Sequence, residues 1–136
     1  MSFQLRDHTA DVAVEATGDS LEETFAAVAD GLTAAMCDEW PDTGDRFSFA
    51  LDAENAEALL FDYLDQLIYE RDVRLVLPVE NAASIAEADG EWHLEGSARG
   101  VPLDEVSARD IKAVTYSEMA VEETADGWRA YVVLDV

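Results

Sequence analysis

The stretch DVAVEATGDSLEETFAAVADGLTAAM, residues 11–36, decides the class of fold, because a strand pattern is followed directly by a helix pattern. In residues 11–16 apolar and polar side chains alternate, which predicts a β-strand. Ser20 and Glu23 then have the spacing of a capping box, which is typical of a helix start. Apolar residues return every three or four positions after it, so we predict one helix over residues 20–36 with an apolar side that covers a sheet.

The remainder of the chain repeats this combination of helix and strand. A second apolar stripe predicts a helix over residues 54–70, with most of its acidic residues on a solvated side. Alternating apolar residues predict strands over residues 47–51, 73–79, a weak segment near 85, 92–98, 113–122 and 128–135, with a connection over 100–107. We therefore expect an α+β fold, a compact single domain over residues 1–136, with two main helices packed on mostly antiparallel sheet.

The composition is strongly acidic but still suited to a globular core. Thirty-one Asp and Glu residues oppose 8 Lys and Arg, which gives a formal net charge of −23, while 49% of the residues are hydrophobic. That hydrophobic content excludes a disordered acidic tail. Nucleic acid backbones and anionic membranes attract clustered Lys and Arg, so we expect no direct nucleic acid binding and no membrane partner. No apolar stretch reaches the length of a signal peptide core or a membrane span, which favours a cytoplasmic location.

The type of basic residue indicates the habitat. All basic residues are Arg except Lys112, and the acidic excess is spread over the whole chain. Like charges repel across a small domain, but in about 1 M salt the screening length falls to about 3 Å. The composition therefore favours a halophile's cytoplasm over the alternative of a dedicated cation-buffering surface.

Few residues are suited to catalysis. Cys37 is the single cysteine, which excludes an internal disulfide and a cysteine cluster for zinc. The sequence has no glycine-rich phosphate loop, no HExxH and no GxSxG, and it contains two histidines. His93 alternates with apolar neighbours and is expected on the exposed side of its strand. His8 opens the cluster HTAD, residues 8–11, which either supplies hydrogen bonds at a strand entry or belongs to a site.

The last strand brings acidic groups together in the predicted hairpin. A two-residue turn at Asp126-Gly127 would pair apolar residues along both strands and would place Glu118 opposite Asp135. Two carboxylates directly across a ladder repel each other, and the α-carboxylate of Val136 adds a third negative group. Calcium or magnesium would fit such oxygen ligands, and Asp11 could complete the cluster if its strand is a neighbour. The alternative is a pair of hydrated strand ends in a protein rich in acids.

Lys112 is the other residue that stands out. It lies in RDIKAVTY, residues 109–116, in a chain that otherwise uses Arg. One reading is a point charge that contacts an anionic partner or the acidic cluster, and the other is an ordinary salt bridge at a strand start.

Several of these segments together resemble the archease family. They are HTAD at 8–11, the helix entry GDSLEE at 18–23, EALLFDYLDQLIYERD at 57–72, IKAVTY at 111–116 and the final LDV at 134–136. HTAD and KAVTY are short motifs, but their order, spacing and placement near the two ends of the chain make the combined resemblance specific. It extends from about residue 3 to residue 136.

The resemblance implies a non-enzymatic protein cofactor of the RtcB-type RNA-splicing ligase, which acts in tRNA splicing and joins RNA ends. Archeases promote guanylylation and multiple turnover of that ligase and are also described as chaperones. The implied fold packs helices on antiparallel sheet. The implied divalent cation is calcium, with Asp11, Asp135 and the terminal carboxylate of Val136 as metal ligands. We expect His8 and Lys112 to contact the partner, and Glu118 to lie just behind the ligands.

One position departs from the family pattern. Archeases commonly continue KAVTY with a histidine, and here the residue is Ser117. Any role of that histidine therefore does not transfer to this chain.

Two other classes of function remain as alternatives. A metal-dependent hydrolase or nucleotide-processing enzyme would use the carboxylates to hold a catalytic cation, but the chain is short of bases and nucleophiles for it. A general chaperone or interaction domain would not depend on Asp11 and Asp135.

Overall fold

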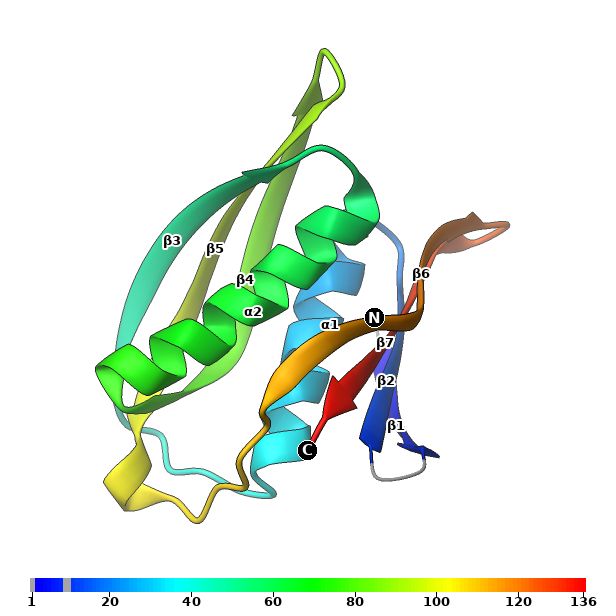
Figure 1. Cartoon of the computed structure of the whole chain (residues 1–136). Helices are drawn as coiled ribbons and strands as arrows, with labels where there is room; N and C mark the ends of the chain where they lie inside the picture. Colours follow the sequence, from blue (N-terminus) through cyan, green and yellow to red (C-terminus); the bar gives the residue numbers. More distant parts are fainter. Residues whose placement is uncertain (1, 9–10) are drawn as a thin grey trace.

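The structure is a computed structural model that describes residues 2–8 and 11–136, with the backbone alone described at positions 6–8. The chain contains two long helices and seven strands within these residues (Figure 1). The helices are α1 (Leu21–Met36) and α2 (Ala56–Arg74). The strands are β1 (Ser2–His8), β2 (Asp11–Gly18), β3 (Asp45–Ala53), β4 (Val76–Ala88), β5 (Glu91–Pro102), β6 (Ala113–Thr124) and β7 (Gly127–Asp135), and a short 3-10 helix η1 (Leu103–Glu105) follows β5.

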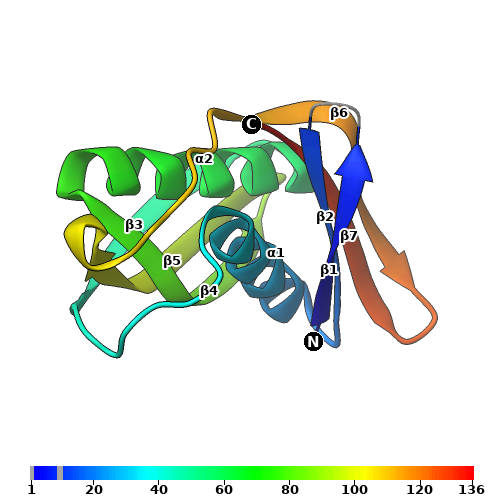
Figure 2. The same cartoon turned by 90° about the horizontal axis from the view of Figure 1, so that it is seen from below.

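The strands form two antiparallel sheets. One has the order β1-β2-β7-β6 and the other β3-β5-β4. Helix α1 lies between the two sheets and contacts β2 of the first and β4 of the second, whereas α2 contacts β6 and all three strands of the second sheet (Figures 1 and 2). The predicted α+β arrangement of two helices on antiparallel sheet is confirmed. Among the described residues, no helix has the length and apolar character needed to cross a membrane.

Helix α1 begins as the sequence predicts. The Ser20 hydroxyl accepts a hydrogen bond from the Glu23 amide at 3.1 Å, and the Glu23 carboxylate accepts one from the Asp19 amide at 3.2 Å. The expectation of a single buried side was too narrow, because 12 of the 16 residues of α1 are buried. Alanine and other small residues allow both sheets to approach this helix closely.

Helix α2 runs further than predicted. Asn55 caps it by accepting the Ala58 amide at 2.8 Å, and the helix continues to Arg74. Val73 and Leu75 were assigned to a strand over 73–79, but Val73 lies in the last turn and is 60% exposed, and Leu75 ends the helix in the left-handed conformation with 66% exposure. Apolar residues spaced two apart also occur at a helix end, so the alternation placed the boundary too early.

Strands β4 and β5 are longer than the pattern indicated. Residues 76–79 of the predicted strand over 73–79 and the weak segment near 85 belong to a single strand, β4, which is interrupted by a bulge between Val79 and Ala82. The bulge turns Asn81 into the interior, where its backbone amide and its side-chain amide both donate to Asp30 Oδ1 on α1, at 3.1 and 2.9 Å. This contact ties α1 to the second sheet.

The Asp30 contact generates a test of stability. Burial raises the pKa of Asp30 above its ordinary value of 3.8, and the hydrogen bonds from Asn81 offset part of the rise. Because the folded-state pKa exceeds the unfolded one, ionisation of Asp30 costs stability above the folded pKa, and the cost vanishes below the unfolded pKa. Asp30→Asn keeps an acceptor oxygen and removes the charge. We expect thermal denaturation at constant high salt to show a higher Tm than wild type at pH 7, with the difference closing as the pH approaches about 4.

Asp104→Asn is the matched control, because Asp104 is exposed and its substitution should give no gain that depends on pH in this way. An Asp30→Asn protein with a Tm equal to or below wild type at pH 7 would contradict the assigned cost of burying this carboxylate.

Candidate functional site

The β6–β7 hairpin has a register that differs from the predicted one. Its turn consists of Ala125 and Asp126, so that Thr124 pairs with Gly127. A Cβ atom at Gly127, where φ is 153°, would come within 2.2 Å of the Gly18 carbonyl oxygen, which explains the glycine at this place. Val121 therefore pairs with Ala130.

A large bulge in β6 then moves Glu118 away from Asp135. Thr115 pairs with Val133 and Ala120 with Tyr131, so four residues of β6 lie across from one residue of β7. Glu118 lies in this bulge with φ at 57°. The prediction that Glu118 opposes Asp135 is wrong, because the alternation of apolar residues continues through the bulge and hides it.

The bulge lets β6 leave its partner strand and pack on α2. Tyr116 stacks on Phe61 of that helix, with 4.3 Å between the ring centroids and 5° between the ring planes. The bulge is therefore fixed by an aromatic contact. Ser117, which stands at the position of the family histidine, follows Tyr116 and is exposed.

Asp135 has a different acidic neighbour from the predicted one. Strand β7 lies between β2 and β6, and Asp135 pairs with Asp11 of β2 on one side and with Ala113 of β6 on the other. Side chains that are directly opposite in an antiparallel pair project from the same face, with Cβ atoms about 4.5–5.5 Å apart. The condition that the strand of Asp11 neighbours the last strand is met, and the two carboxylates are brought together from opposite ends of the sequence.

Lys112 lies beside this pair. Its backbone amide donates to the Asp135 carbonyl oxygen at 2.9 Å, immediately before β6 begins. Its side chain is exposed and makes no ion pair within the described part of the chain. Val136 follows Asp135 and is 41% exposed, so its carboxylate lies at the same end of the sheet.

The HTAD motif is described in part. His8 ends β1, and the ladder pairs its backbone with that of Asp11, which begins β2. The side chain of His8 lies outside the described atoms, as do Thr9 and Ala10, so the proposed contact of His8 stays a prediction.

The oxygen atoms at this place are of the type that a hard cation prefers, but there are few of them. Within the described residues, no group of three or more His, Cys, Asp or Glu side chains is close enough to hold a metal ion. Asp11 and Asp135 offer two carboxylates, and the α-carboxylate of Val136 adds a third that is not a side chain. Calcium takes six to eight oxygen ligands, so carbonyl groups or water would have to supply the others. Oxygen donors of this type fit calcium or magnesium and do not fit a soft transition metal.

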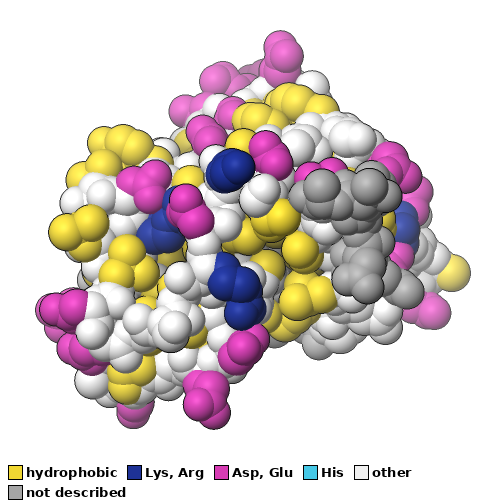
Figure 3. Space-filling view, turned by 60° about the horizontal axis from the view of Figure 1, so that its bottom comes forward, with side chains coloured by type: hydrophobic (Ala, Val, Ile, Leu, Met, Phe, Trp, Pro, Cys, Tyr) yellow, Lys and Arg dark blue, Asp and Glu magenta, His cyan; other side chains and the backbone are white. Residues whose placement is uncertain are grey.

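Figure 3 looks onto the end of the molecule where the last residues and the start of β6 lie. Lys and Arg side chains gather near the middle of this face, with Asp and Glu side chains around them and apolar atoms between them. The segment before β6 carries the exposed residues Arg109 and Lys112, and α2 carries Arg71, whose side chain is 8% exposed. In a chain with 31 acidic residues, Lys and Arg side chains thus lie close together on this face.

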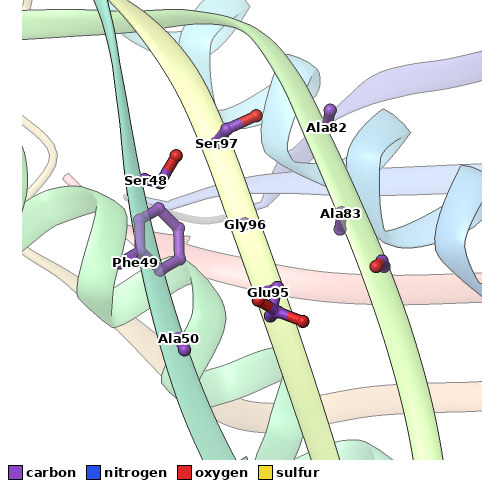
Figure 4. Close-up of a pocket in the computed structure, with 9 residues that line it drawn as sticks. Ser48, Phe49, Ala50, Ala82, Ala83, Glu95, Gly96 and Ser97 are labelled. Atoms are coloured by element: carbon purple, nitrogen blue, oxygen red, sulfur yellow. The ribbon is translucent and has the colours of Figure 1, made fainter.

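The larger hollows of the molecule lie elsewhere. One of about 620 Å³ follows the outer face of the second sheet (Figure 4). It is lined by Ser48, Phe49, Ala50, Ala82, Ala83, Ser84, Glu95, Gly96 and Ser97. Glu95 is the one ionisable residue among them, so this hollow lacks the paired acid and base that hydrolysis needs.

A second hollow of about 500 Å³ is acidic and was not anticipated from the sequence. It lies between the start of α2 and the β4–β5 turn. Its lining includes the carboxylates of Asp52, Glu54, Asp62, Asp89 and Glu91. Burial, and secondarily Asp65, raises the pKa of Asp62. These residues come from separate segments, so no local motif could have indicated them.

Comparison with known proteins agrees with the fold. The sequence matches the Archease protein family over residues 3–136. It is 34% identical to protein archease of Methanosarcina barkeri, over 98% of this chain and 95% of that one, and 31% identical to protein archease of Pyrococcus furiosus, over 96% and 95%.

Two solved structures are also similar. The solution structure of protein 1598 of Methanobacterium thermoautotrophicum gives a TM-score of 0.87 at 29% identity and covers 99% of both chains. The crystal structure of an archease from Thermotoga maritima, described as a possible chaperone, has the same fold with a TM-score of 0.63 at 23% identity, over 98% of this chain and 96% of that one. The family match spans nearly the whole sequence, and the chain therefore belongs to the archease family.

Proposed function

We propose that this protein is a non-enzymatic activator of an RtcB-type RNA ligase, which acts through a surface organised by a divalent cation, calcium. The pairing of Asp11 with Asp135 beside Lys112 carries the proposal. It places two residues of the expected ligand set next to each other and next to the expected partner contact. Val136 adds its carboxylate in this proposal, and Glu118 would have to reach the ligands from the bulge, because it does not face Asp135 across the ladder.

The chemistry of the site supports a binding role. A bound cation would offset the negative charge of the two Asp side chains and give an anionic group of the partner a point of attachment. Asp11 and Asp135 would hold the cation, and the Lys112 ammonium group would contact the partner. The proposed mechanism is a shift of the ligase towards the state competent for guanylylation, since binding energy that favours one conformation changes its population.

The charge of the protein supports a protein partner over direct RNA contact. A net charge of −23 repels a phosphate backbone, so the ligase would hold the RNA. The same charge supports work in the salt-rich cytoplasm of a halophile, where screening shortens the range of the repulsion.

The ligase assay is the direct test. At high salt and with calcium present, wild type should accelerate guanylylation of the ligase, and Asp11→Asn and Asp135→Asn should each lower that acceleration by about tenfold or more, since each removes a charged ligand. Asp126→Asn, in the exposed turn of the same hairpin, should behave as wild type. Undiminished acceleration by both site variants would refute the cation-dependent mechanism.

Calcium binding is measurable without the ligase. A ligand that binds the folded state alone stabilises it by about 2.7 kcal/mol when present at 100 times its Kd. Calcium added at constant ionic strength should therefore raise the Tm of wild type, and Asp135→Asn should abolish the rise while Asp126→Asn retains it. An equal rise for all three proteins would show that calcium acts on the acidic surface in general.

The contribution of Val136 calls for a third experiment. An extension of Gly-Ser-Gly-Ser after Val136 removes the α-carboxylate from its present place and leaves every side chain intact. We expect calcium to raise the Tm of the extended protein less than that of wild type. The control is the same Gly-Ser-Gly-Ser extension on the Asp135→Asn background. Calcium should not raise the Tm of that protein, so an effect of the extension itself on the Tm can be measured there. An extended protein with the full calcium response would exclude Val136 from the ligand set.

A further inference from the structure

The segment before β6 is held in place by two arginines, which lie within the sequence motifs but have no role assigned to them there. Residues 107–112 have no regular secondary structure, yet they lead directly to Lys112 and to its hydrogen bond with Asp135. A segment without a ladder or a helix has to be ordered by other contacts, because fixing its residues costs conformational entropy.

Arg109 fastens the segment to the end of α1. Its backbone amide donates to the Met36 carbonyl at 2.6 Å, and its Nε donates to the Ala35 carbonyl at 3.0 Å. Its Nη2 also pairs with Asp38 at 3.1 Å. The last carbonyls of a helix lack partners within the helix and attract positive charge, and α1 has no basic residue in its own last turn. Arg109 supplies that charge from a distant part of the chain.

Arg71 fastens the same segment to α2. Its side chain is 8% exposed, and its Nη1 donates to the Ile111 carbonyl at 3.3 Å and contacts Met36 Sδ at 3.3 Å. Its Nη2 pairs with Asp72 and with Asp110, at 3.0 and 3.2 Å. One guanidinium group therefore joins both helices to the two residues that precede Lys112.

These contacts leave little freedom for the backbone at Lys112. Arg109 holds the segment three residues before it, Arg71 holds the Ile111 carbonyl next to it, and the Asp135 carbonyl accepts its amide. We propose that Arg71 and Arg109 are positioning residues, which fix Lys112 beside the Asp11–Asp135 pair so that its ammonium group meets the partner from a preformed place. The inference rests on the proposed function for the role of Lys112, and its structural part stands by itself.

The shape of the guanidinium group makes a sharp substitution available. Arg donates from a planar fork to several acceptors at once, whereas the Lys ammonium group is a compact point charge. Arg71→Lys retains the charge but cannot reach Ile111, Asp72 and Asp110 together. Arg74→Lys is the matched control, because Arg74 belongs to the same last turn of α2 but pairs with Glu70 and lies over the Phe47 ring.

The structural part is tested by hydrogen exchange at the Lys112 amide. Arg71→Lys and Arg109→Lys should each speed exchange of this amide about tenfold or more, while amides in the centre of β5 exchange as in wild type and Arg74→Lys leaves the Lys112 amide unchanged. If Arg71→Lys unfolds, Arg109→Lys decides the outcome, since the Arg109 side chain is 55% exposed. Wild-type exchange at Lys112 in the folded variants would overturn the inference.

The functional part is tested by a double-mutant cycle in the guanylylation assay. Arg71→Lys and Lys112→Ala should each raise the protein concentration needed for half-maximal acceleration, by about tenfold, and the double variant should resemble Lys112→Ala alone. A general loss of structure would instead give effects that multiply. Multiplied effects would refute a role through Lys112, whereas a wild-type protein without any acceleration would refute the proposed function and leave the exchange result to decide the positioning.

Discussion

Strand β2 begins at Asp11 and strand β7 ends at Asp135, so the two strands belong to opposite ends of the sequence, yet they pair from end to end in the middle of the four-stranded sheet. Their apolar residues form one wall of the core against α1. The same pairing sets Asp11 against Asp135. The backbone carbonyl of Asp135 then accepts the hydrogen bond from the Lys112 amide. The candidate site therefore follows from a contact that also holds the fold together.

The elements with a strong local pattern were predictable from the sequence. The capping box and apolar periodicity of α1 and the apolar periodicity of α2 located both helices, and the alternation in β2, β3 and β5 located those strands. Strand β1 was not predicted, because its alternation rests on only two apolar residues, Phe3 and Leu5, and its regularity comes from pairing with β2. The ends of α2 and β4 were misplaced for a similar reason, since the spacing at Val73 and Leu75 fits both kinds of element.

The sequence indicated that Asp11 and Asp135 could lie together, but it did not indicate how β6 pairs with β7. The repulsion of facing carboxylates directed attention to Asp135, and Asp11 was named as a neighbour on the condition that its strand lies alongside, which it does. Glu118 was misplaced because a bulge of several residues leaves no trace in an alternating sequence. Arg71 was not singled out at all, since its partners at Met36 and Asp110 lie far from it along the chain.

The central place of β7 has a consequence for the synthesis of the protein. β2 and β6 are both made before the strand that lies between them, so the four-stranded sheet cannot close until β7 has been made. The second sheet and α2 lie within residues 45–102 and can associate earlier. Pairing between distant segments is slow, because the entropy cost of closing a long loop comes before any stabilising contact forms. On the ribosome, the core around α1 thus stays open towards one side until the final strand emerges, and the two carboxylates of the site meet in that same last step.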